Sequence, residues 1–584
     1  MSVEFRITDD QYEKWIREFD TLSPSDCEQI HEHIIRLACR PLISINMPAF
    51  ETPAHLLKEA IASVRNQLYP NWELCIADDA SPSPHVSAIC HAEADADPRI
   101  RIIRRDSNGH ISAASNSAFS IATGDFVALM DHDDILPRHA LYHLAVAINA
   151  KPEVDIIYSD EDQIDASGRR RNPYFKTDWN PDLMLGHNMI SHLTAYRRSL
   201  VETVGYFREG YEGSQDYDLS LRAIAATRPD KIHHIPHVLY HWRRSYGPAS
   251  FSETWMEKCC DSARRAIADY LVQTGSRGSV SSHPLIKNWY LVTHPLPPVP
   301  PLVSLLVPTR DRADLLEKCV TGLLQRTDYR NFEIVILDNQ SREPATHSLL
   351  SKLSKDNRVR IIPYDKPFNY SAINNFGAAQ AKGSVLGLIN NDIDVIDPNW
   401  LSEMVSLAVL PDAGAVGARL LYEDGRLQHG GVILGVGGVA NHFNHLLPRE
   451  EFGYFGRSVL RSTVSAVTGA CLVVRKSVFE QVNGLDEVNL PVAFNDVDFC
   501  LRIKEKGYRN IWTPVELYHL ESASRGPDTT PEAAARFSSE VSYMLRRWGD
   551  VLAEDPFYSP NMSRENGRFL LASPPRVRQP WNHP

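Results

Sequence analysis

Short hydrophobic runs alternate along this chain with segments whose apolar residues have helical spacing. PLISINMP, beginning at Pro41, is an apolar run ended by proline, and HLLKEAIASVRNQL then repeats apolar residues at helical spacing. Two further apolar runs, WELCIADDAS and ATGDFVALMDHDD, end in carboxylates. Strands that alternate with amphipathic helices predict an α/β fold, with a mostly parallel sheet covered by helices.

The same series of segments occurs twice. PLVSLLVP at Pro301 repeats PLISINMP at Pro41, and FEIVILDNQS repeats WELCIADDAS at the same offset of 260 residues. Three more pairs follow in the same order: SNSAFSIATGDFVALMDHDD with NNFGAAQAKGSVLGLINND, SQDYDLSLR with FNDVDFCLR, and IPHVLYHW with WTPVELYHL. Five ordered matches are difficult to obtain by chance, so we predict two copies of one domain.

The repeat sets the predicted domain boundaries. The two copies occupy residues 41–250 and 301–530. Residues 1–40 read as acidic helices that form an N-terminal extension, and residues 251–300 contain a helical segment followed by the proline-rich linker HPLPPVPP. Residues 531–584 predict a helix and then a proline-rich tail, which we expect to extend over the surface.

Composition narrows the class of protein. The 584 residues are 43% hydrophobic and carry a net charge of −12, which argues against a disordered chain and against nucleic acid as the main partner. No apolar run reaches the roughly 20 residues that span a bilayer, and we expect no signal peptide. The nine cysteines have no metal-type spacing. We expect reduced thiols in a cytoplasmic protein, and association with the inner face of the cytoplasmic membrane stays open.

Carboxylates collect where the predicted strands end, which is the edge at which open α/β sheets bind ligands. They are Asp78, Asp79, Asp131 and Asp133 in the first copy, and Asp338, Asp392 and Asp394 in the second. A single aspartate at such a place is usually a turn residue or a helix cap. Two carboxylates close together suit Mg²⁺ or Mn²⁺, which they share with the phosphates of a substrate.

Two further residue types recur after these carboxylates. Asp216 and Asp496 lie in SQDYDLSLR and FNDVDFCLR, where a lone carboxylate can act as general base or simply cap the helix that follows. His241 and His519 each follow an apolar run and could complete a metal shell or hold a diphosphate. Taken alone, such a histidine more often has a structural role.

In ordered combination, these motifs resemble those of inverting family 2 glycosyltransferases with the GT-A fold. The resemblance covers residues 41–250 and 301–530. It rests on ADDAS, ATGDFVALMDHDD, SQDYDLSLR and YHW in the first copy, and on LDNQS, KGSVLGLINND, FNDVDFCLR and YHLES in the second. It implies two GT-A domains in tandem, a nucleoside diphosphate sugar as donor (UDP, dTDP or GDP type), a divalent cation, and transfer with inversion at the anomeric carbon.

The resemblance also implies a role for each candidate residue. Asp216 and Asp496 would be the catalytic bases. The donor contacts would come from Asp78 and Asp338, with Asp79, Asn116 and Asn375 as further candidates. The cation ligands would be Asp131, Asp133 and His241 in the first copy, and Asp392, Asp394 and His519 in the second. Of these, Asp394 has the alternative of facing solvent or capping the next helix.

The second copy departs from the family pattern. Asn390 stands at the first metal position, which predicts weaker cation binding there. In both copies the residue before the base, commonly glutamate in the family, is an amide, Gln215 or Asn495. The base itself is kept in both, so we expect both copies to be catalytic.

These expectations describe a bifunctional glycosyltransferase that acts on a growing, lipid-linked glycan, as in bacterial O-antigen or capsule assembly. One alternative keeps a single catalytic copy and makes the other a scaffold that binds the acceptor. A nucleotidyltransferase is a second alternative, but NMPAFETP and VPTRDRAD do not supply the glycine-rich, basic phosphate loop that such enzymes usually show.

Several features leave two interpretations open. Residues 158–182 are either an edge hairpin with core aromatics or part of an acceptor groove in which Tyr174 and Trp179 stack on sugars. The basic run at 169–171 is either a solvated loop or a contact for anionic lipid or acidic sugar. Thr468 and Gly469 are expected on the acceptor side. The histidines without nearby carboxylates are expected to be structural, namely His429, His442 and His445.

Overall fold

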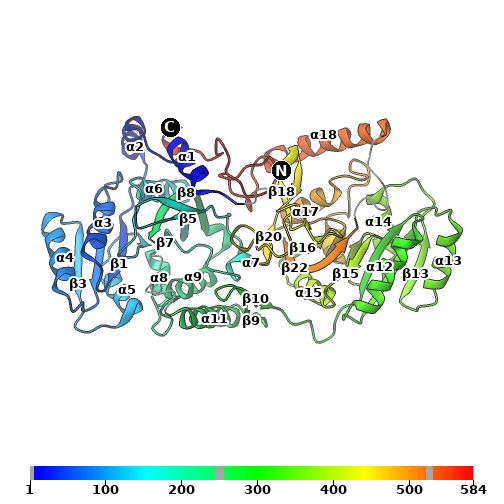
Figure 1. Cartoon of the computed structure of the whole chain (residues 1–584), viewed down its shortest axis with the longest axis horizontal. Helices are drawn as coiled ribbons and strands as arrows, with labels where there is room; N and C mark the ends of the chain where they lie inside the picture. Colours follow the sequence, from blue (N-terminus) through cyan, green and yellow to red (C-terminus); the bar gives the residue numbers. More distant parts are fainter. Residues whose placement is uncertain (1–5, 244–254, 521–529, 583–584) are drawn as a thin grey trace.

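The protein forms two α/β lobes that lie side by side in an elongated molecule (Figure 1). The computed structural model describes residues 6–243, 255–520 and 530–582. We call the lobe of residues 43–243 module 1 and the lobe of residues 303–519 module 2. The predicted duplication and α/β fold class are therefore confirmed.

Both modules have the same strand order. In module 1 the order is β3 (Ile100–Arg104), β2 (Trp72–Asp78), β1 (Ile43–Ala49), β4 (Phe126–Leu129), β7 (Thr194–Arg197) and β5 (Ile156–Ile164). Two more strands pair with β5, the antiparallel β6 (Arg170–Tyr174) and the parallel β8 (Ile232–Arg243). In module 2 it is β13 (Val359–Pro363), β12 (Phe332–Asp338), β11 (Val303–Thr309), β14 (Val385–Ile389), β21 (Cys471–Arg475), β16 (Ala413–Leu421), β22 (Arg509–His519) and β15 (Ile393–Val395). The first four strands are parallel in each sheet, and β7 and β21 are antiparallel to them.

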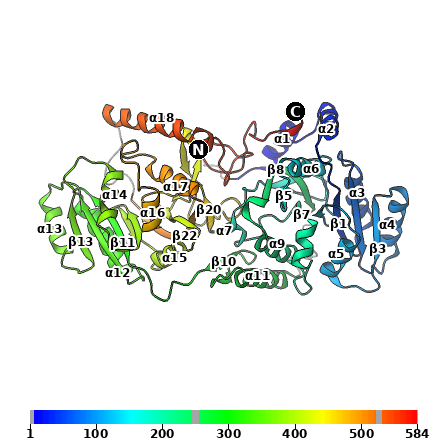
Figure 2. The ribbon, with the colours of Figure 1, turned by 180° about the vertical axis from the view of Figure 1, so that it is seen from behind.

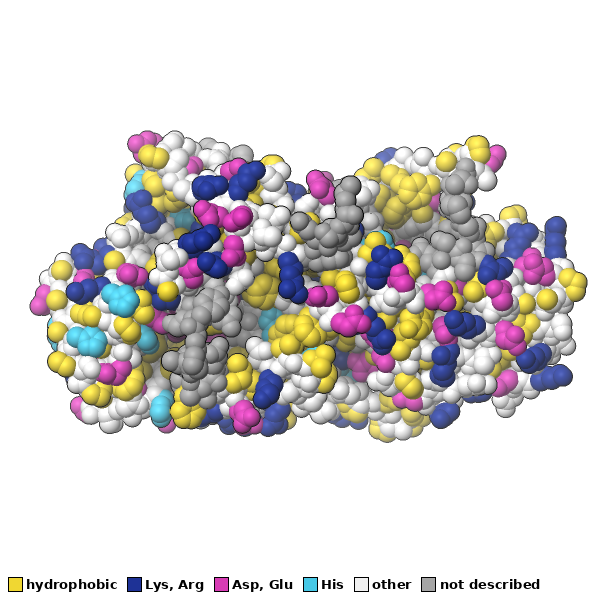
Figure 3. Space-filling model, in the orientation of Figure 1, with side chains coloured by type: hydrophobic (Ala, Val, Ile, Leu, Met, Phe, Trp, Pro, Cys, Tyr) yellow, Lys and Arg dark blue, Asp and Glu magenta, His cyan; other side chains and the backbone are white. Residues whose placement is uncertain are grey.

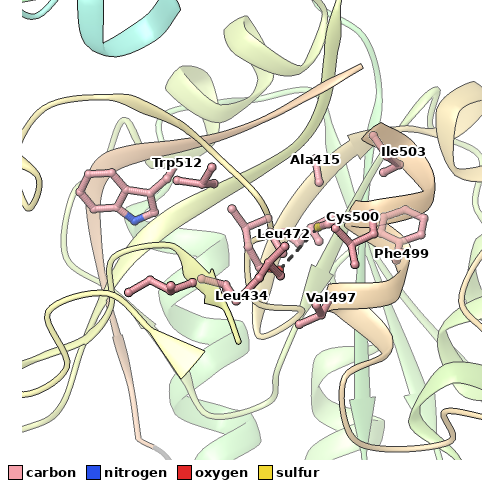
Figure 4. Close-up of a cluster of buried hydrophobic side chains, with 14 of the residues drawn as sticks. Ala415, Leu434, Leu472, Val497, Phe499, Cys500, Ile503 and Trp512 are labelled. Carbon is pink, nitrogen blue, oxygen red and sulfur yellow. Dashed lines mark hydrogen bonds between the residues drawn. The ribbon is translucent and has the colours of Figure 1, made fainter. Parts of the chain in front are cut away.

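Helices cover both faces of each sheet, because their apolar residues recur at helical spacing. In module 1, α3 (Ala54–Arg65), α4 (Pro84–Ala96) and α6 (Ala140–Ala150) cover one face, and α5 (His110–Ser120), α8 (Arg198–Val204) and α9 (Gln215–Ala225) the other. In module 2 the sets are α12 (Ala313–Arg326), α13 (Pro344–Leu353) and α15 (Trp400–Ala408), and α14 (Tyr370–Gln380), α16 (Lys476–Gln481) and α17 (Asn495–Glu505). Figure 4 shows Leu472, Phe499 and Trp512 within one of these cores.

A buried polar network is repeated in both modules. It explains why Gly124 in SNSAFSIATGDFVALMDHDD matches Gly383 in NNFGAAQAKGSVLGLINND. The Ser44 hydroxyl donates to Glu73 at 2.6 Å and accepts the backbone N–H of Gly124 at 2.9 Å. A side chain on Gly124 would meet the carbonyl oxygen of Leu42 at 2.6 Å, so only glycine fits. The residues of module 2 that repeat these contacts, at 2.6 and 2.8 Å, are Ser304, Glu333 and Gly383.

The extensions pack against the modules. α1 (Asp9–Phe19) and α2 (Pro24–Arg36) lie on module 1, and α11 (Met256–Gln273) packs on α9 before a hairpin of β9 (Ser279–Ser282) and β10 (Tyr290–Thr293) that the sequence did not predict. α18 (Pro531–Ala553) lies on module 2, and the tail after it crosses back to module 1 in both views (Figures 1 and 2). Along this path the tail buries several aromatic rings, those of Phe557, Tyr558, Phe569 and Trp581.

The basic run at 169–171 is paired with the N-terminal extension. Arg169 contacts Glu13 at 3.1 Å, Arg170 contacts Asp20 at 2.5 Å, and Arg171 contacts Asp9 at 3.0 Å. Neither interpretation from the sequence, a solvated loop or a contact for an anion, describes these ion pairs. Their role in the structure is to dock α1 on the hairpin of β5 and β6.

The two modules share a packed interface. Asn180 donates to the carbonyl oxygen of Thr463 at 3.0 Å, and Asp182 pairs with Arg509. The ring of Tyr174 stacks on Phe455 with centroids 3.9 Å apart. The hairpin at 158–182 is therefore an edge hairpin whose aromatic end is buried against module 2. The two modules therefore pack into a single unit and are not joined by the linker alone.

Acidic and basic side chains are interspersed across both modules on the face drawn in Figure 3. None of the helices within the described ranges has the length and apolar character needed to cross a membrane.

Candidate active sites

The nucleoside candidates lie at the end of β2 and its counterpart β12. Asp78 is buried; its Oδ1 accepts the N–H of Ser81 at 2.9 Å. Its Oδ2 faces Arg104 at 3.6 Å and, within the described part of the chain, makes no hydrogen bond. Asp79 is committed to Arg105, at 2.8 Å, and to a backbone N–H. Of the two carboxylates, only Asp78 has a buried oxygen to which none of the described residues donates a hydrogen bond.

The second module presents the same end of the sheet with one change. Asp338 is half-buried at the end of β12 and accepts the N–H of Ser341 at 3.1 Å, as Asp78 does from Ser81. Asn339 replaces Asp79 and donates to two carbonyl oxygens, those of Tyr364 and Lys366. The predicted pairing of Asp78 with Asp338 thus extends to the turn that each carboxylate supports.

Carboxylates crowd the loop after β4. Asp131 and Asp133 are half-buried, and the fully buried Asp134 accepts the Tyr240 hydroxyl at 2.5 Å. Burial raises the pKa of Asp133, against the effect of His132, and the charge of Asp131 raises it further. Burial and the same Asp131 charge raise the pKa of Asp134 well above its usual range. The loop therefore concentrates negative charge, which favours a cation.

His241 is fixed beside this loop by main chain and side chain. Its backbone forms an antiparallel bridge with Ile135, with N–H···O distances of 2.9 and 3.2 Å. Its Nδ1 lies 2.6 Å from Oδ1 of Asp162, a buried carboxylate on β5. The sequence analysis missed Asp162, although acids inside the strand-like run YSDEDQI were a signal for it.

The candidate base of module 1 lies in the first turn of α9. Asp216 accepts the side-chain N–H of Asn188 at 2.8 Å. Burial raises the pKa of Asp216; His192 opposes the rise and Asp131 adds to it. Because the charge of Asp131 contributes to this rise, the structure brings the candidate base close to the carboxylates after β4.

In module 2 the predicted cation ligands converge on one histidine. Nε2 of His519 lies 3.2 Å from Oδ1 of Asp392 and 3.2 Å from Nδ2 of Asn390. Its Nδ1 lies 2.7 Å from Oε1 of Gln428. Asp394 lies apart from this group, because its carboxylate pairs with Arg326 and with Lys318 of α12, the latter at 3.6 Å. We therefore leave Asp394 out of the candidate site.

The base of module 2 is held by a different donor. Asp496 accepts the backbone N–H of Gly469 at 2.8 Å, and burial raises its pKa while this hydrogen bond opposes the rise. The Tyr370 hydroxyl donates to the carbonyl oxygen of Gly469 at 2.8 Å. Burial, then the charges of Asp496 and Asp392, raise the pKa of Tyr370, so the tyrosine lies near both carboxylates. No sequence signal pointed to Tyr370.

Asn116 and Asn375 have the same structural role in the two modules. Asn116 forms two hydrogen bonds with the backbone of Phe207, at 2.9 and 3.0 Å, and Asn375 does the same with Leu485, at 2.9 and 2.8 Å. Asn375 also lines a cavity of about 710 Å³ together with Leu485 and Arg547. Both amides hold the loop that precedes the candidate base. This geometry does not support a contact of either side chain with the nucleotide-sugar donor.

The residues fit a cation that takes part of its ligands from the substrate. Among the described residues, no three His, Cys, Asp or Glu side chains are arranged to hold a metal ion by themselves. Mg²⁺ is commonly bound by one or two carboxylates and completes its shell with water and phosphate oxygens. The crowded carboxylates of module 1, and Asp392 beside His519 in module 2, supply that number and type of ligand.

Comparison with known proteins gives a family and several relatives. The family model described as "Glycosyl transferase family 2" matches residues 44–205 and 304–482. The chain is 46% identical over 565 residues to an uncharacterized protein of Sinorhizobium fredii, covering 96% of this chain and 62% of that protein. It is 38% identical over 542 residues to the O-antigen biosynthesis protein RfbC of Myxococcus xanthus, covering 92% of this chain and 42% of that protein. The chain thus spans less than two thirds of the length of either relative.

Two solved structures show a partial likeness to this chain. The mannosyltransferase PcManGT from Pyrobaculum calidifontis, in complex with GDP-Man and Mn²⁺, is 17% identical with a TM-score of 0.34, over 45% of this chain and 70% of that chain. S. aureus TarS 1–349 in complex with UDP-GlcNAc is 18% identical with a TM-score of 0.31, over 40% of this chain and 72% of that chain.

Proposed function

Because the chain belongs to glycosyl transferase family 2 through both of its modules, we propose that it transfers two sugars from nucleoside diphosphate donors to a growing surface polysaccharide. One observation supports the proposal: a strand-end aspartate, a histidine and a candidate base aspartate occupy equivalent positions of the same fold in both modules. They are Asp133, His241 and Asp216 in module 1, and Asp392, His519 and Asp496 in module 2. The name of the Myxococcus xanthus relative supports O-antigen assembly as the setting.

In module 1, Asp216 is placed to deprotonate the acceptor. Burial raises its pKa, which makes the ionised carboxylate a stronger base. As the acceptor oxygen bonds to the anomeric carbon, its proton passes to Asp216, and the bond from that carbon to the diphosphate breaks on the opposite side. Asn188 holds the other carboxylate oxygen, and within the described ranges its own Oδ1 has no hydrogen-bond donor. That oxygen could accept a hydroxyl of the acceptor.

The leaving diphosphate needs positive charge near it. A divalent cation held by Asp131 and Asp133 with His241, or by Asp392 with His519, would neutralise the charge that develops there. The free Oδ2 of Asp78 would accept a hydrogen bond from the nucleoside, with Asp338 in the same place in module 2.

The packed interface supports two transfers to one acceptor. Two sites held in one body raise the effective concentration of the first product at the second site. We therefore propose that the two modules add their sugars alternately to one lipid-linked glycan.

The test separates the two modules in the full chain. Asp216→Asn and Asp496→Asn are assayed with a panel of nucleotide sugars for diphosphate release and linkage formed, with and without Mn²⁺. Each substitution should remove one linkage, by about 10²- to 10⁴-fold, and leave the other. Asp95→Asn, an exposed carboxylate of α4, is the control.

Three results would change the conclusion. If either base variant leaves both linkages intact, the division of labour is wrong. If Asp496→Asn changes only the affinity for the acceptor, module 2 is a scaffold. Release of pyrophosphate in place of nucleoside diphosphate would identify a nucleotidyltransferase.

A further inference from the structure

The histidines of the two candidate sites have different partners behind them. Nδ1 of His241 faces Oδ1 of Asp162 at 2.6 Å, whereas Nδ1 of His519 faces the amide oxygen of Gln428 at 2.7 Å. Both partners accept a hydrogen from Nδ1, which leaves the lone pair on Nε2. Only Asp162 brings a carboxylate, and a carboxylate at this place makes the imidazole a better ligand.

Asp162 is in turn held by the N-terminal extension. Its Oδ2 accepts the hydroxyl of Tyr12 at 2.6 Å and Nε of Arg170 at 2.6 Å. Tyr12 belongs to α1 and is 1% exposed, and Arg170 also pairs with Asp20, next to the end of α1, at 2.5 Å. Asp162 therefore takes three short hydrogen bonds while it has no exposed surface.

α1 is well placed to act on module 1 through these contacts. It contacts β6, and it lies near β8, the strand that carries His241, in both views (Figures 1 and 2). Tyr12 and Asp162 are 150 residues apart in the sequence, and Asp162 and His241 are neighbours in the paired strands β5 and β8. A helix outside the sheet thus reaches the candidate site through two consecutive hydrogen bonds.

We propose that α1 is a positioning element of the first donor site: Tyr12 and Arg170 hold Asp162, and Asp162 orients His241 toward the divalent cation of the nucleoside diphosphate donor. This inference rests on the proposed function. In module 2 the neutral amide of Gln428 stands where module 1 has Asp162, so the first site binds the cation more tightly than the second.

The test measures Mn²⁺ binding by electron paramagnetic resonance, with UDP and then GDP present, in the full-length chain. An Asp392→Asn background removes the second site, so that the titration reports the first. Asp162→Asn should weaken Mn²⁺ binding by about 10- to 100-fold, and Asp162→Glu should restore part of it. Tyr12→Phe, which removes one hydroxyl, should weaken binding in the same direction by a smaller factor. Asp10→Asn, an exposed carboxylate of α1, should leave it unchanged.

A reciprocal variant tests the comparison between the modules. Gln428→Glu places a carboxylate behind His519, and in an Asp131→Asn background it should tighten Mn²⁺ binding at the second site. Circular dichroism and thermal melting of every variant separate loss of fold from loss of affinity.

The outcomes distinguish this inference from the proposed function. If Asp162→Asn and Tyr12→Phe remain folded and bind Mn²⁺ like the wild type, α1 only stabilises the fold and the inference is overturned. If the wild type transfers sugar without binding Mn²⁺, the inference fails while the transferase function stands. If neither sugar transfer nor nucleotide release occurs with any donor, the proposed function itself fails.

Discussion

His234 links module 1 to the C-terminal tail and titrates in an accessible pH range. Its Nε2 lies 2.8 Å from Oδ1 of Asp160, and its Nδ1 lies 3.3 Å from Oδ1 of Asp178. The other oxygen of Asp160 accepts Nδ2 of Asn561, from the tail, at 3.1 Å. Burial lowers the pKa of His234, but Asp160 and Asp178 together outweigh burial and raise the pKa from 6.5 to about 9.

The size of the effect follows from the two pKa values. A histidine whose folded pKa lies above its unfolded pKa stabilises the fold fully below the unfolded value and loses this contribution as the pH rises through the folded value. With values of 6.5 and about 9, the contribution of His234 is roughly 2–3 kcal/mol at pH 7 and falls close to zero at pH 9.5. The side chain is 2% exposed, so solvent screens this interaction little.

Urea denaturation of the wild type and His234→Asn, at intervals from pH 7 to pH 9.5, gives the difference in the free energy of unfolding. We expect the difference to shrink by roughly 2 kcal/mol over this range. The adjacent His233 is the control, because burial and Lys151 lower its pKa to about 4 and it is neutral in both states above pH 7. His233→Asn should give a difference that does not change with pH. A His234→Asn difference that is equally flat would refute the reasoning.

Three further outcomes are expected. Asn188→Ala removes a donor to the ionised Asp216, so the acid limb of kcat/KM for the first linkage should move to higher pH, while the second linkage keeps its profile. Gly124→Ala should lower the free energy of unfolding of module 1 by about 2 kcal/mol or more, measured by urea denaturation. Gly549 in α18 has open space where a side chain would lie, so Gly549→Ala should raise the free energy of unfolding by about 0.5–1 kcal/mol. Trp581→Ala should cost about 3–5 kcal/mol and expose the tail to proteolysis, measured as the rate of cleavage beyond α18.

Local patterns carried most of what the sequence could predict. The duplication, the strand ends and the residues at those ends follow from short motifs and their order, and the structure places Asp131 near Asp216 and Asp392 beside His519. Asp394 shows the limit of such reasoning. Motif spacing alone does not say that β15 begins at Ile393 and directs the next carboxylate toward α12.

Contacts between distant segments left no local signal. Tyr12 meets Asp162 from 150 residues away, and Trp581 donates to Asp26 from 555 residues away. Their sequence neighbourhoods read as an amphipathic helix and a proline-rich tail. What fixes these contacts is the packing of whole elements, because the buried hydroxyl or indole N–H must find an acceptor wherever the fold brings one.

The two modules share the same scaffold but differ in the groups that surround their candidate bases. The Ser44 network of module 1 recurs in module 2 with distances that agree within about 0.1 Å, which preserves the sheet edge in both. The bases are held differently: a side-chain amide donates to Asp216 and a backbone N–H donates to Asp496. A backbone donor needs no side chain beside the acceptor, whereas Asn188 fills space and adds an amide oxygen to which none of the described residues donates. Under the proposed function, two acceptor sides with different donors to the base would select different hydroxyls, which favours two distinct linkages over one reaction carried out twice.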